Sequence, residues 1–211
     1  MRHLRYLLAA LVLFCTLPAF AADEHAYAPE DCEFRMEFPG APFQARRCDP
    51  NNPTMCREMT SFTKVFGLDA SLSINITCNK AETNMYERYN GDVMQTTLSA
   101  MLGRNHLDDY QTGYQEFDEA KQAVLLGTGQ AGNSEKIFVA QLWIGHKSVL
   151  TVEAELIGSE TTKESDTMFS DMLHSIRHEA WPKPGDSAES VAESARSDDA
   201  APQGSKAEKT P

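Results

Sequence analysis

The sequence has little positive charge. Its 211 residues include 19 lysines and arginines against 31 aspartates and glutamates, so the formal net charge at pH 7 is -12. Nucleic acids and anionic membrane surfaces attract proteins through basic patches. We therefore expect no nucleic-acid partner, and the acidity favours solubility. With 41% hydrophobic residues, the chain still has enough apolar side chains to build one folded domain.

Long apolar runs are also missing after the N-terminus. The chain begins with a basic stretch, continues with an apolar run over 6–17, and has an A-x-A cleavage site at 19–21. This pattern predicts a signal peptide over 1–21 and a mature chain that begins at Ala22. No later stretch reaches the roughly 18 apolar residues of a membrane-spanning helix. We expect a soluble periplasmic or secreted protein without a transmembrane anchor after signal cleavage.

Cys15 raises a second possibility, which is a lipoprotein. Lipidation requires a small residue directly before the cysteine, whereas Phe14 stands there. We therefore favour ordinary cleavage over lipidation.

The motifs of common enzyme classes are absent from the sequence. It has no G-x-S-x-G, no H-E-x-x-H, no phosphate-binding glycine loop and no dinucleotide fingerprint. We assign no catalytic residue, no cofactor and no metal. His174 and His178 are four residues apart on a predicted helix, where both rings could reach one ion. Because a third ligand is missing, we interpret them as solvated residues at a helix C-terminus.

Four cysteines remain in the mature chain: Cys32, Cys48, Cys56 and Cys78. An even number in an exported chain predicts two disulfides, for which three pairings are formally possible. No two of these cysteines form C-x-x-C, so a thioredoxin-like redox role lacks its motif. Zinc is the competing interpretation. It needs closely spaced pairs, whereas these cysteines are 16, 8 and 22 residues apart.

Apolar periodicity divides the domain into strands and helices. Four strands come first, over 32–38, 43–48, 57–66 and 70–78, and a helix follows over 84–103. Four more strands cover 109–117, 121–127, 135–144 and 148–157, and a second helix begins at Thr161 with Glu164 in its capping box. Strand 135–144 has apolar residues on both faces, which indicates a central strand. We predict an α+β fold, a mostly antiparallel sheet flanked by helices in the order ββββ-α-ββββ-α.

The composition changes after Trp181. The stretch 182–211 has no aromatic residue and is rich in alanine, serine, proline and charged residues. Such a segment cannot bury enough apolar surface to offset the entropy of ordering. We predict a disordered tail over 182–211, a folded domain over 31–181 and a short lead over 22–30.

The predicted meander of the first four strands favours one pairing of the cysteines. Odd strands begin and even strands end at the same edge, so all four cysteines gather there. Cys48 and Cys56 flank a single loop, while Cys32 and Cys78 lie on the apolar face of their strands. We therefore predict the disulfides Cys48–Cys56 and Cys32–Cys78.

Two segments carry a resemblance to a known family. Residues 34–42, FRMEFPGAP, resemble the opening strand and F-P-G-x-P turn of small exported bacterial members of the PsbP-like fold. Residues 168–177, MFSDMLHSIR, are similar to their last helix. The fold includes photosystem II extrinsic subunits, Ran-binding Mog-type proteins and DcrB-like envelope proteins. The resemblance implies binding or assembly without shared catalytic residues; the four cysteines and the missing lipobox depart from it.

Taken with the resemblance, the sequence predicts a periplasmic, non-catalytic binding or assembly-accessory domain with an envelope protein as its partner. A carrier or sensor of a small apolar ligand is the alternative. An enzyme with an unrecognised site is a second alternative, since catalytic triads depend on geometry. Four tyrosines could line a ligand groove, although we interpret them as core or half-buried cover: Tyr86, Tyr89, Tyr110 and Tyr114. Glu153 and Glu155 are interpreted as the solvated side of a strand.

Overall fold

The computed structural model describes residues 25–49, 52–102, 106–159 and 162–182. The signal peptide predicted over 1–21 lies outside these residues. So do Cys15 and the predicted tail from residue 183 onward.

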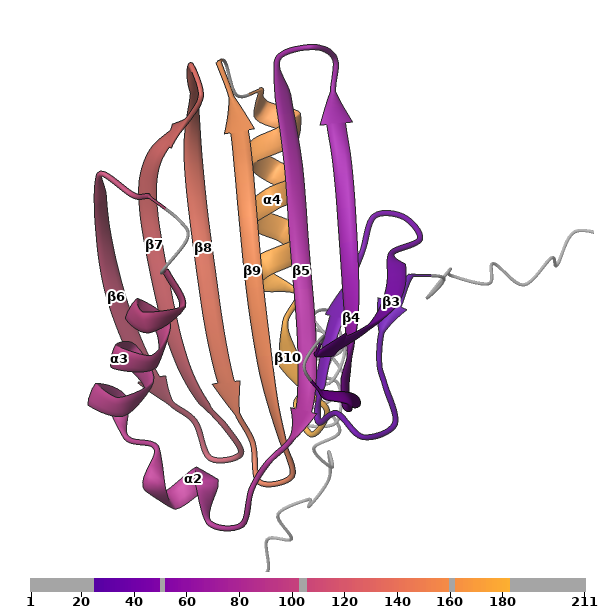
Figure 1. The fold of residues 1–211 in the computed structure, drawn as a ribbon, viewed down its shortest axis with the longest axis vertical. Helices are drawn as coiled ribbons and strands as arrows, with labels where there is room; N and C mark the ends of the chain where they lie inside the picture. The colour runs from indigo at the N-terminus through magenta and orange to yellow at the C-terminus, as the bar shows by residue number, and fades with distance from the viewer. Residues whose placement is uncertain (1–24, 50–51, 103–105, 160–161, 183–211) are drawn as a thin grey trace, which may run out of the picture.

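The main sheet has seven strands and is antiparallel throughout (Figure 1). In spatial order the strands are β3 (Phe43–Asp49), β4 (Asn52–Phe66), β5 (Ala70–Lys80), β9 (Ser148–Gly158), β8 (Ser134–Ile144), β7 (Lys121–Ala131) and β6 (Asp109–Glu116). The predicted fold class is confirmed, because the fold is α+β with a mostly antiparallel sheet and flanking helices. The element order follows ββββ-α-ββββ-α with short additions.

A small second sheet consists of β1 (Ala26–Tyr27), β2 (Phe34–Glu37) and β10 (Arg177–His178), with β2 in the middle. β2 does not pair with β3, so the predicted four-stranded meander beginning at Cys32 is wrong. The physical reason is burial. Phe34 and Met36 are fully buried in the core of the main sheet, so β2 covers a face of that sheet and does not extend its edge.

The helix predicted over 84–103 is divided into α2 (Met85–Arg88) and α3 (Gly91–Met101). The side chain of Asn90 accepts a hydrogen bond from the backbone N–H of Val93 at 3.0 Å and caps α3. Asparagine is a preferred N-cap, whereas glycine disfavours a helix interior, so the helix restarts at Gly91. A Cβ there would lie only 3.0 Å from the Tyr114 ring, so the glycine also lets α3 approach β6 closely.

The last helix, α4 (Lys163–His174), begins after a different cap from the predicted one. Thr162 Oγ1 accepts a hydrogen bond from the backbone N–H of Ser165 at 3.2 Å, and Ser165 Oγ accepts one from the N–H of Thr162 at 2.9 Å. Ser165 thus fills the role expected of Glu164. Thr161, the predicted cap, lies outside the described residues.

Each face of the main sheet carries its own core. α4 and β2 cover one face, over a cluster that includes Leu72, Ile74, Leu150 and Val152. α3 covers the other face over β6, β7 and β8, where its Met94 and Leu98 are fully buried. β8 contributes to both cores, with Phe138, Ala140, Leu142 and Ile144 on the α3 side and Val139 and Trp143 on the other. The prediction of a central strand covered on both faces is confirmed.

The α3 side of the sheet is covered over only part of its width. α3 lies in front of β6 and β7, while β9, β5 and β4 have no helix in front of them (Figure 1). Ser73, Asn75, Glu153 and Glu155 share this face and are half-buried. This arrangement agrees with the interpretation of Glu153 and Glu155 as the solvated side of a strand.

Two cysteine pairs are bonded in the structure. Cys32 is bonded to Cys78, which joins β5 to the segment just before β2, and their Cα atoms are 6.1 Å apart. Cys48 is bonded to Cys56 between β3 and β4, with a Cα separation of 3.9 Å. These are the pairs that the sequence favours. The reasoning behind the first pair needs correction, because Cys32 reaches β5 from a strand stacked on the sheet and not from a strand within it.

We predict unequal contributions of the two disulfides to stability. The Cys32–Cys78 loop spans 46 residues and the Cys48–Cys56 loop spans 8. The loop-entropy relation gives about 4 kcal/mol for the longer loop and about 2.5 kcal/mol for the shorter one. Denaturant unfolding of Cys32→Ala with Cys78→Ala, against Cys48→Ala with Cys56→Ala, measures the difference. Peptide mapping without reduction that linked Cys32 to Cys48 would contradict the pairing.

Candidate functional site

A groove of about 670 Å³ runs along α4 beside the turn that follows β2. The segment of Phe38 and Pro39 lines one side of the groove, and α4 lines the other side from Lys163 to Ser175. At 1.5 Å per helical residue, this stretch of α4 is about 18 Å long. The groove is therefore long enough for several residues of a peptide.

The base of the groove is apolar. Phe38 and Met172 are 7% and 2% exposed, and Met168 is half-buried beside them. Methionine side chains are flexible and polarizable, so they adapt to different apolar partners. The base suits an apolar side chain of an incoming molecule.

The rim of the groove is predominantly acidic. Glu37, Glu164 and Asp171 line it together with Lys163, and all four are exposed. Three carboxylates against one ammonium group leave a net negative rim. Such a rim favours a basic residue beside the apolar group of a ligand.

Ser175 fixes the two walls of the groove to each other. Its hydroxyl oxygen accepts a hydrogen bond from the backbone N–H of Glu37 at 3.0 Å and donates one to the carbonyl of Met172 at 2.7 Å. The end of α4 and the end of β2 are therefore joined through one side chain. The groove is held open by hydrogen bonds within the fold.

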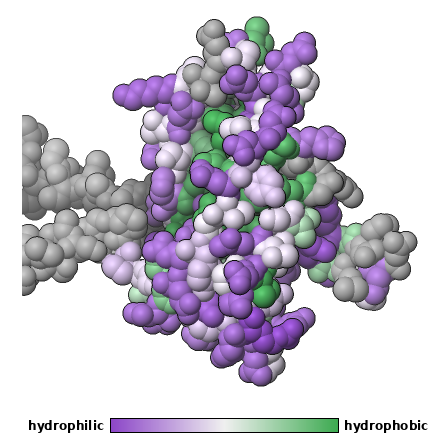
Figure 2. Space-filling view, turned by 90° about the vertical axis from the view of Figure 1, so that its left-hand side faces the viewer, coloured by the Kyte–Doolittle hydropathy of each residue, from purple (hydrophilic) through white to green (hydrophobic). Residues whose placement is uncertain are grey.

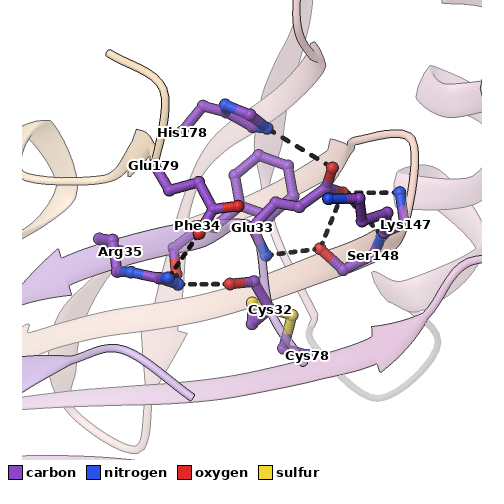
Figure 3. The surroundings of a disulfide bond; sticks show 9 residues. All are labelled: Cys32, Glu33, Phe34, Arg35, Cys78, Lys147, Ser148, His178 and Glu179. Atoms are coloured by element: carbon purple, nitrogen blue, oxygen red, sulfur yellow. Dashed lines mark hydrogen bonds and ion pairs between the residues drawn. A yellow bond between two sulfur atoms is a disulfide. The ribbon is translucent and has the colours of Figure 1, made fainter. Parts of the chain in front are cut away.

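Glu33 fixes the start of β2 to the turn between β8 and β9 (Figure 3). Its carboxylate is buried and accepts hydrogen bonds from the backbone N–H groups of Lys147 and Ser148, at 2.7 and 2.8 Å, and from the Ser148 hydroxyl at 3.2 Å. Ser148 Oγ in turn accepts a hydrogen bond from the backbone N–H of Glu33. Hydrogen bonds from backbone N–H groups compensate the cost of burying the carboxylate.

Ser148, His178 and Glu33 are residue types of a catalytic triad, but their arrangement is different. The carboxylate stands between the other two groups: Ser148 Oγ contacts Glu33 Oε2, and His178 Nε2 lies 3.7 Å from Glu33 Oε1. In a triad the imidazole must contact the hydroxyl. Ser148 is also fully buried, out of reach of a substrate. The cluster fixes the strand and does not supply a nucleophile.

The interpretation of His174 and His178 as solvated neighbours on a helix is wrong for His178. α4 ends at His174, which is exposed and lies with Nδ1 2.9 Å from the Ser170 carbonyl oxygen. His178 belongs to β10 and is 5% exposed, with its ring edge-on to Phe34. Its Nδ1 accepts a hydrogen bond from the backbone N–H of Ala180 at 3.2 Å, whereas its Nε2, 3.7 Å from Glu33 Oε1, has no hydrogen-bond partner among the described residues.

The four tyrosines do not form one groove. Tyr86, Tyr89 and Tyr114 pack against the core under α3, as the core interpretation expected, and Tyr86 also stacks on His146. Burial, a hydrogen bond to Glu116 and the charge of that carboxylate raise the pKa of Tyr114 to about 12. Tyr110 is 48% exposed and lines a separate groove between α3 and β6.

Over residues 25–49, 52–102, 106–159 and 162–182, no three histidine, cysteine, aspartate or glutamate side chains gather in a way that could hold a metal ion. Within the same ranges, no helix has the length and apolar character needed to cross a membrane.

Sequence reasoning missed the α4 groove, although it singled out the residues on both walls. Phe38 and Pro39 belong to the F-P-G-x-P segment, and Met168 and Met172 belong to the apolar stripe of the last helix. The groove exists because β2 and α4 lie side by side on one face of the sheet. No local sequence pattern predicts that β2 and α4 lie close together.

Neither a family model nor a curated protein matches this chain. Among solved structures, the fold is similar to the solution structure of cyanobacterial PsbP (CyanoP) from Synechocystis sp. PCC 6803. The two chains are 14% identical, and the match covers 73% of this chain and 91% of that chain with a TM-score of 0.42. The segments 34–42 and 168–177 resemble members of this same PsbP-like fold. The likeness concerns the course of the chain and says nothing of ligands or partners.

We predict that Glu33 is important for stability. Glu33→Ala leaves the buried N–H group of Ser148 and the part-buried N–H group of Lys147 without their acceptor and should lower the free energy of unfolding by about 3 kcal/mol. Glu33→Gln keeps one acceptor oxygen and should lose roughly half as much. Denaturant unfolding measures both changes, with Glu30→Ala, an exposed glutamate, as the control. Equal, small losses in all three variants would contradict the role of the buried carboxylate.

Glu153 provides a prediction about pH. Burial, and then the charge of Glu155, raise its pKa above the usual value, so the folded state favours the neutral carboxyl. Ionisation of Glu153 therefore destabilises the folded state. This effect is absent in acid, develops as the pH rises through the range in which the carboxyl group titrates, and is complete near neutrality. Glu153→Gln should therefore raise Tm by about 2 °C at pH 7 and change it little near pH 3.

The exposed Glu119, changed to glutamine, is the control for Glu153→Gln. It removes the same charge without the burial. A Tm gain at pH 7 that persisted undiminished in acid would contradict the electrostatic explanation.

Proposed function

We propose that this chain is an exported, non-catalytic binding domain that assists assembly in the bacterial envelope, and that its α4 groove holds a segment of the partner protein. The groove itself is the observation that carries the proposal. It combines an apolar base, an acidic rim and walls fixed by Ser175. Such grooves in rigid frames commonly receive peptide segments.

The chemistry of the groove describes the segment it would hold. The apolar base, formed by Phe38, Met168 and Met172, favours an apolar side chain of the segment. The carboxylates of Glu37 and Asp171 favour a lysine or arginine next to it. A length of about 18 Å corresponds to about three turns of helix or five to six residues of extended chain. The partner segment is therefore short, apolar and flanked by basic residues.

Two features support export to the periplasm or beyond. The basic start, the apolar run and the A-x-A site have the pattern of a signal peptide over 1–21. Both cysteine pairs of the described domain are bonded, and disulfides persist in oxidising compartments. The mature protein would then begin at Ala22.

A small apolar ligand is the second candidate occupant of the groove. The volume of about 670 Å³ lies within the range of small-molecule sites, roughly 300 to 1,000 Å³. The acidic rim along the full length of α4 favours a peptide over a compact apolar molecule.

Photo-crosslinking in the native envelope tests the proposal. A photoreactive amino acid in place of Thr167, which is exposed on the groove wall, is introduced into the full chain. We expect crosslinks to one envelope protein, at an apolar segment that carries a lysine or arginine. Asp171→Arg in the same chain should lower the yield about tenfold, because it reverses a rim charge.

The matched control is Asp69→Arg, since Asp69 is also exposed but lies in the turn between β4 and β5. It should leave the crosslinks unchanged. Crosslinks that Asp171→Arg did not reduce would contradict the groove as the docking site. Stabilisation against heat by a copurified small molecule, without a crosslinked protein, would favour the ligand candidate instead.

A further inference from the structure

β6 lies at one end of the main sheet and is an open edge. Among the described residues, no strand pairs with its outer side, so alternate backbone N–H and C=O groups of residues 109–116 point away from the sheet. Figure 1 shows β6 as the outermost strand, with α3 in front of it. Unpaired edges of this kind are templates for another strand.

This edge lacks the features that usually prevent pairing. Natural edges are protected by lysine, proline, bulges or short length. The sequence of β6, DYQTGYQE, has no lysine and no proline, and its register with β7 runs without a shift over all eight residues. The edge is therefore regular enough to accept a partner strand.

Charge argues against a second copy of β6 as that strand. In a full-length antiparallel pair of two β6 strands, Asp109 of each copy would stand opposite Glu116 of the other. Like charges directly opposite each other destabilise a strand pair. The same two carboxylates would attract a strand with lysine or arginine near its ends, and β6 itself has no basic residue to oppose it.

The side of the edge next to α3 is polar. A groove of about 510 Å³ lies there between α3 and β6, lined by Asp92, Gln95, Thr96, Ser99, Tyr110 and Thr112. Its walls are joined by the hydrogen bond that Thr112 Oγ1 donates to Gln95 Oε1 at 3.0 Å. Carboxylate, amide and hydroxyl groups here suit basic or hydrogen-bonding side chains, and the exposed Tyr110 ring offers a face to a cation.

On the opposite side of the edge, Gln111 and Gln115 of β6 flank Gly113, and apolar side chains of β7 lie beyond the glycine. Gly113 has no neighbouring atom within 4 Å of the position of a Cβ, and its partner on β7 is the half-buried Val124. Leu126, two residues further along the same face of β7, is 39% exposed. Figure 2 faces this edge of the molecule and shows a band of apolar residues running along it. A large side chain of an added strand could cross Gly113 and reach this apolar surface.

We propose that β6 binds an extended segment of a partner protein as an additional strand of the main sheet. The segment carries basic or hydrogen-bonding side chains toward α3 and, on the other face, an apolar side chain opposite Gly113. Backbone hydrogen bonds provide the affinity, and the two differently lined sides provide the orientation. This site is on a different edge from the α4 groove and does not rest on the function proposed for that groove.

Two synthetic peptides test strand addition to the full mature chain. One alternates lysine with valine, and the other alternates glutamate with valine. Calorimetry should show binding of the first peptide, at least about tenfold tighter than any binding of the second. Hydrogen exchange should show slower exchange of β6 amides only with the first peptide, because added backbone hydrogen bonds protect them.

A third peptide distinguishes strand pairing from charge attraction. It has the lysine and valine sequence with a methyl group on every backbone nitrogen, so it keeps the charge but can donate no backbone hydrogen bond to β6 from either edge. Its binding should be lost. Undiminished binding of this peptide, or failure of the unmethylated peptide to bind, would overturn the proposal.

Charge reversal on the protein provides the complementary test. Asp109→Lys with Glu116→Lys should weaken binding of the lysine and valine peptide about tenfold, since the contact of a peptide lysine with Glu116 on the α3 side is lost and the edge becomes positively charged at both ends. Glu58→Lys with Asp69→Lys reverses two exposed acids beside the opposite edge and should have no effect. Equal weakening by both variants would show general charge attraction and would refute the site. Self-association of the unaltered chain that Asp109→Lys strengthens, because the change places unlike charges opposite each other, would instead identify a second copy as the occupant and would also refute the proposal.

Discussion

Cys32 and Glu33 are neighbours in the sequence, and together they fix β2 to the main sheet at two points. Cys32 is bonded to β5, while Glu33 holds the turn between β8 and β9 through hydrogen bonds from two backbone N–H groups. With β2 held there, Phe34 and Met36 cover one face of the main sheet, and β10 pairs with β2. The α4 groove depends on the same attachment, because one of its walls begins where β2 ends.

The unequal covering of the sheet explains where binding surfaces occur. Among the described residues, one face is covered by α4, β2 and β10, and the other by α3 and α2 at one end. A core on both sides makes β8 the most protected strand, while the β6 edge and the groove beside α4 remain accessible. Binding surfaces on a frame that is rigid in this way need little ordering when a partner arrives.

Much of the fold could be predicted from the alternation of apolar residues. The double-sided pattern of Phe138 and Val139 identified the central strand, and the single-sided pattern of β9 identified its neighbour. Alternation states which face is buried but not what covers it, so the pairing of β2 could not be predicted. For the same reason the burial of His178 could not be predicted, since Glu33, which lies beside its ring, is 145 positions earlier in the chain. Gly91 disfavours a helix interior, but local sequence alone does not show that Asn90 caps a new helix at this point.

The strand order has a consequence for how the chain folds. β3, β4 and β5 are sequential neighbours, and so are β6, β7, β8 and β9, so each set can form as a local meander. Within the described part of the main sheet, only the seam between β5 and β9, which pairs Ala70 with Gly158 and Lys80 with Ser148, joins distant parts of the sequence. Loop closure opposes such non-local pairing, and folding rates fall as the share of non-local contacts rises. The seam is therefore the expected slow step, and until it closes each half of the sheet exposes a second unpaired edge to other chains.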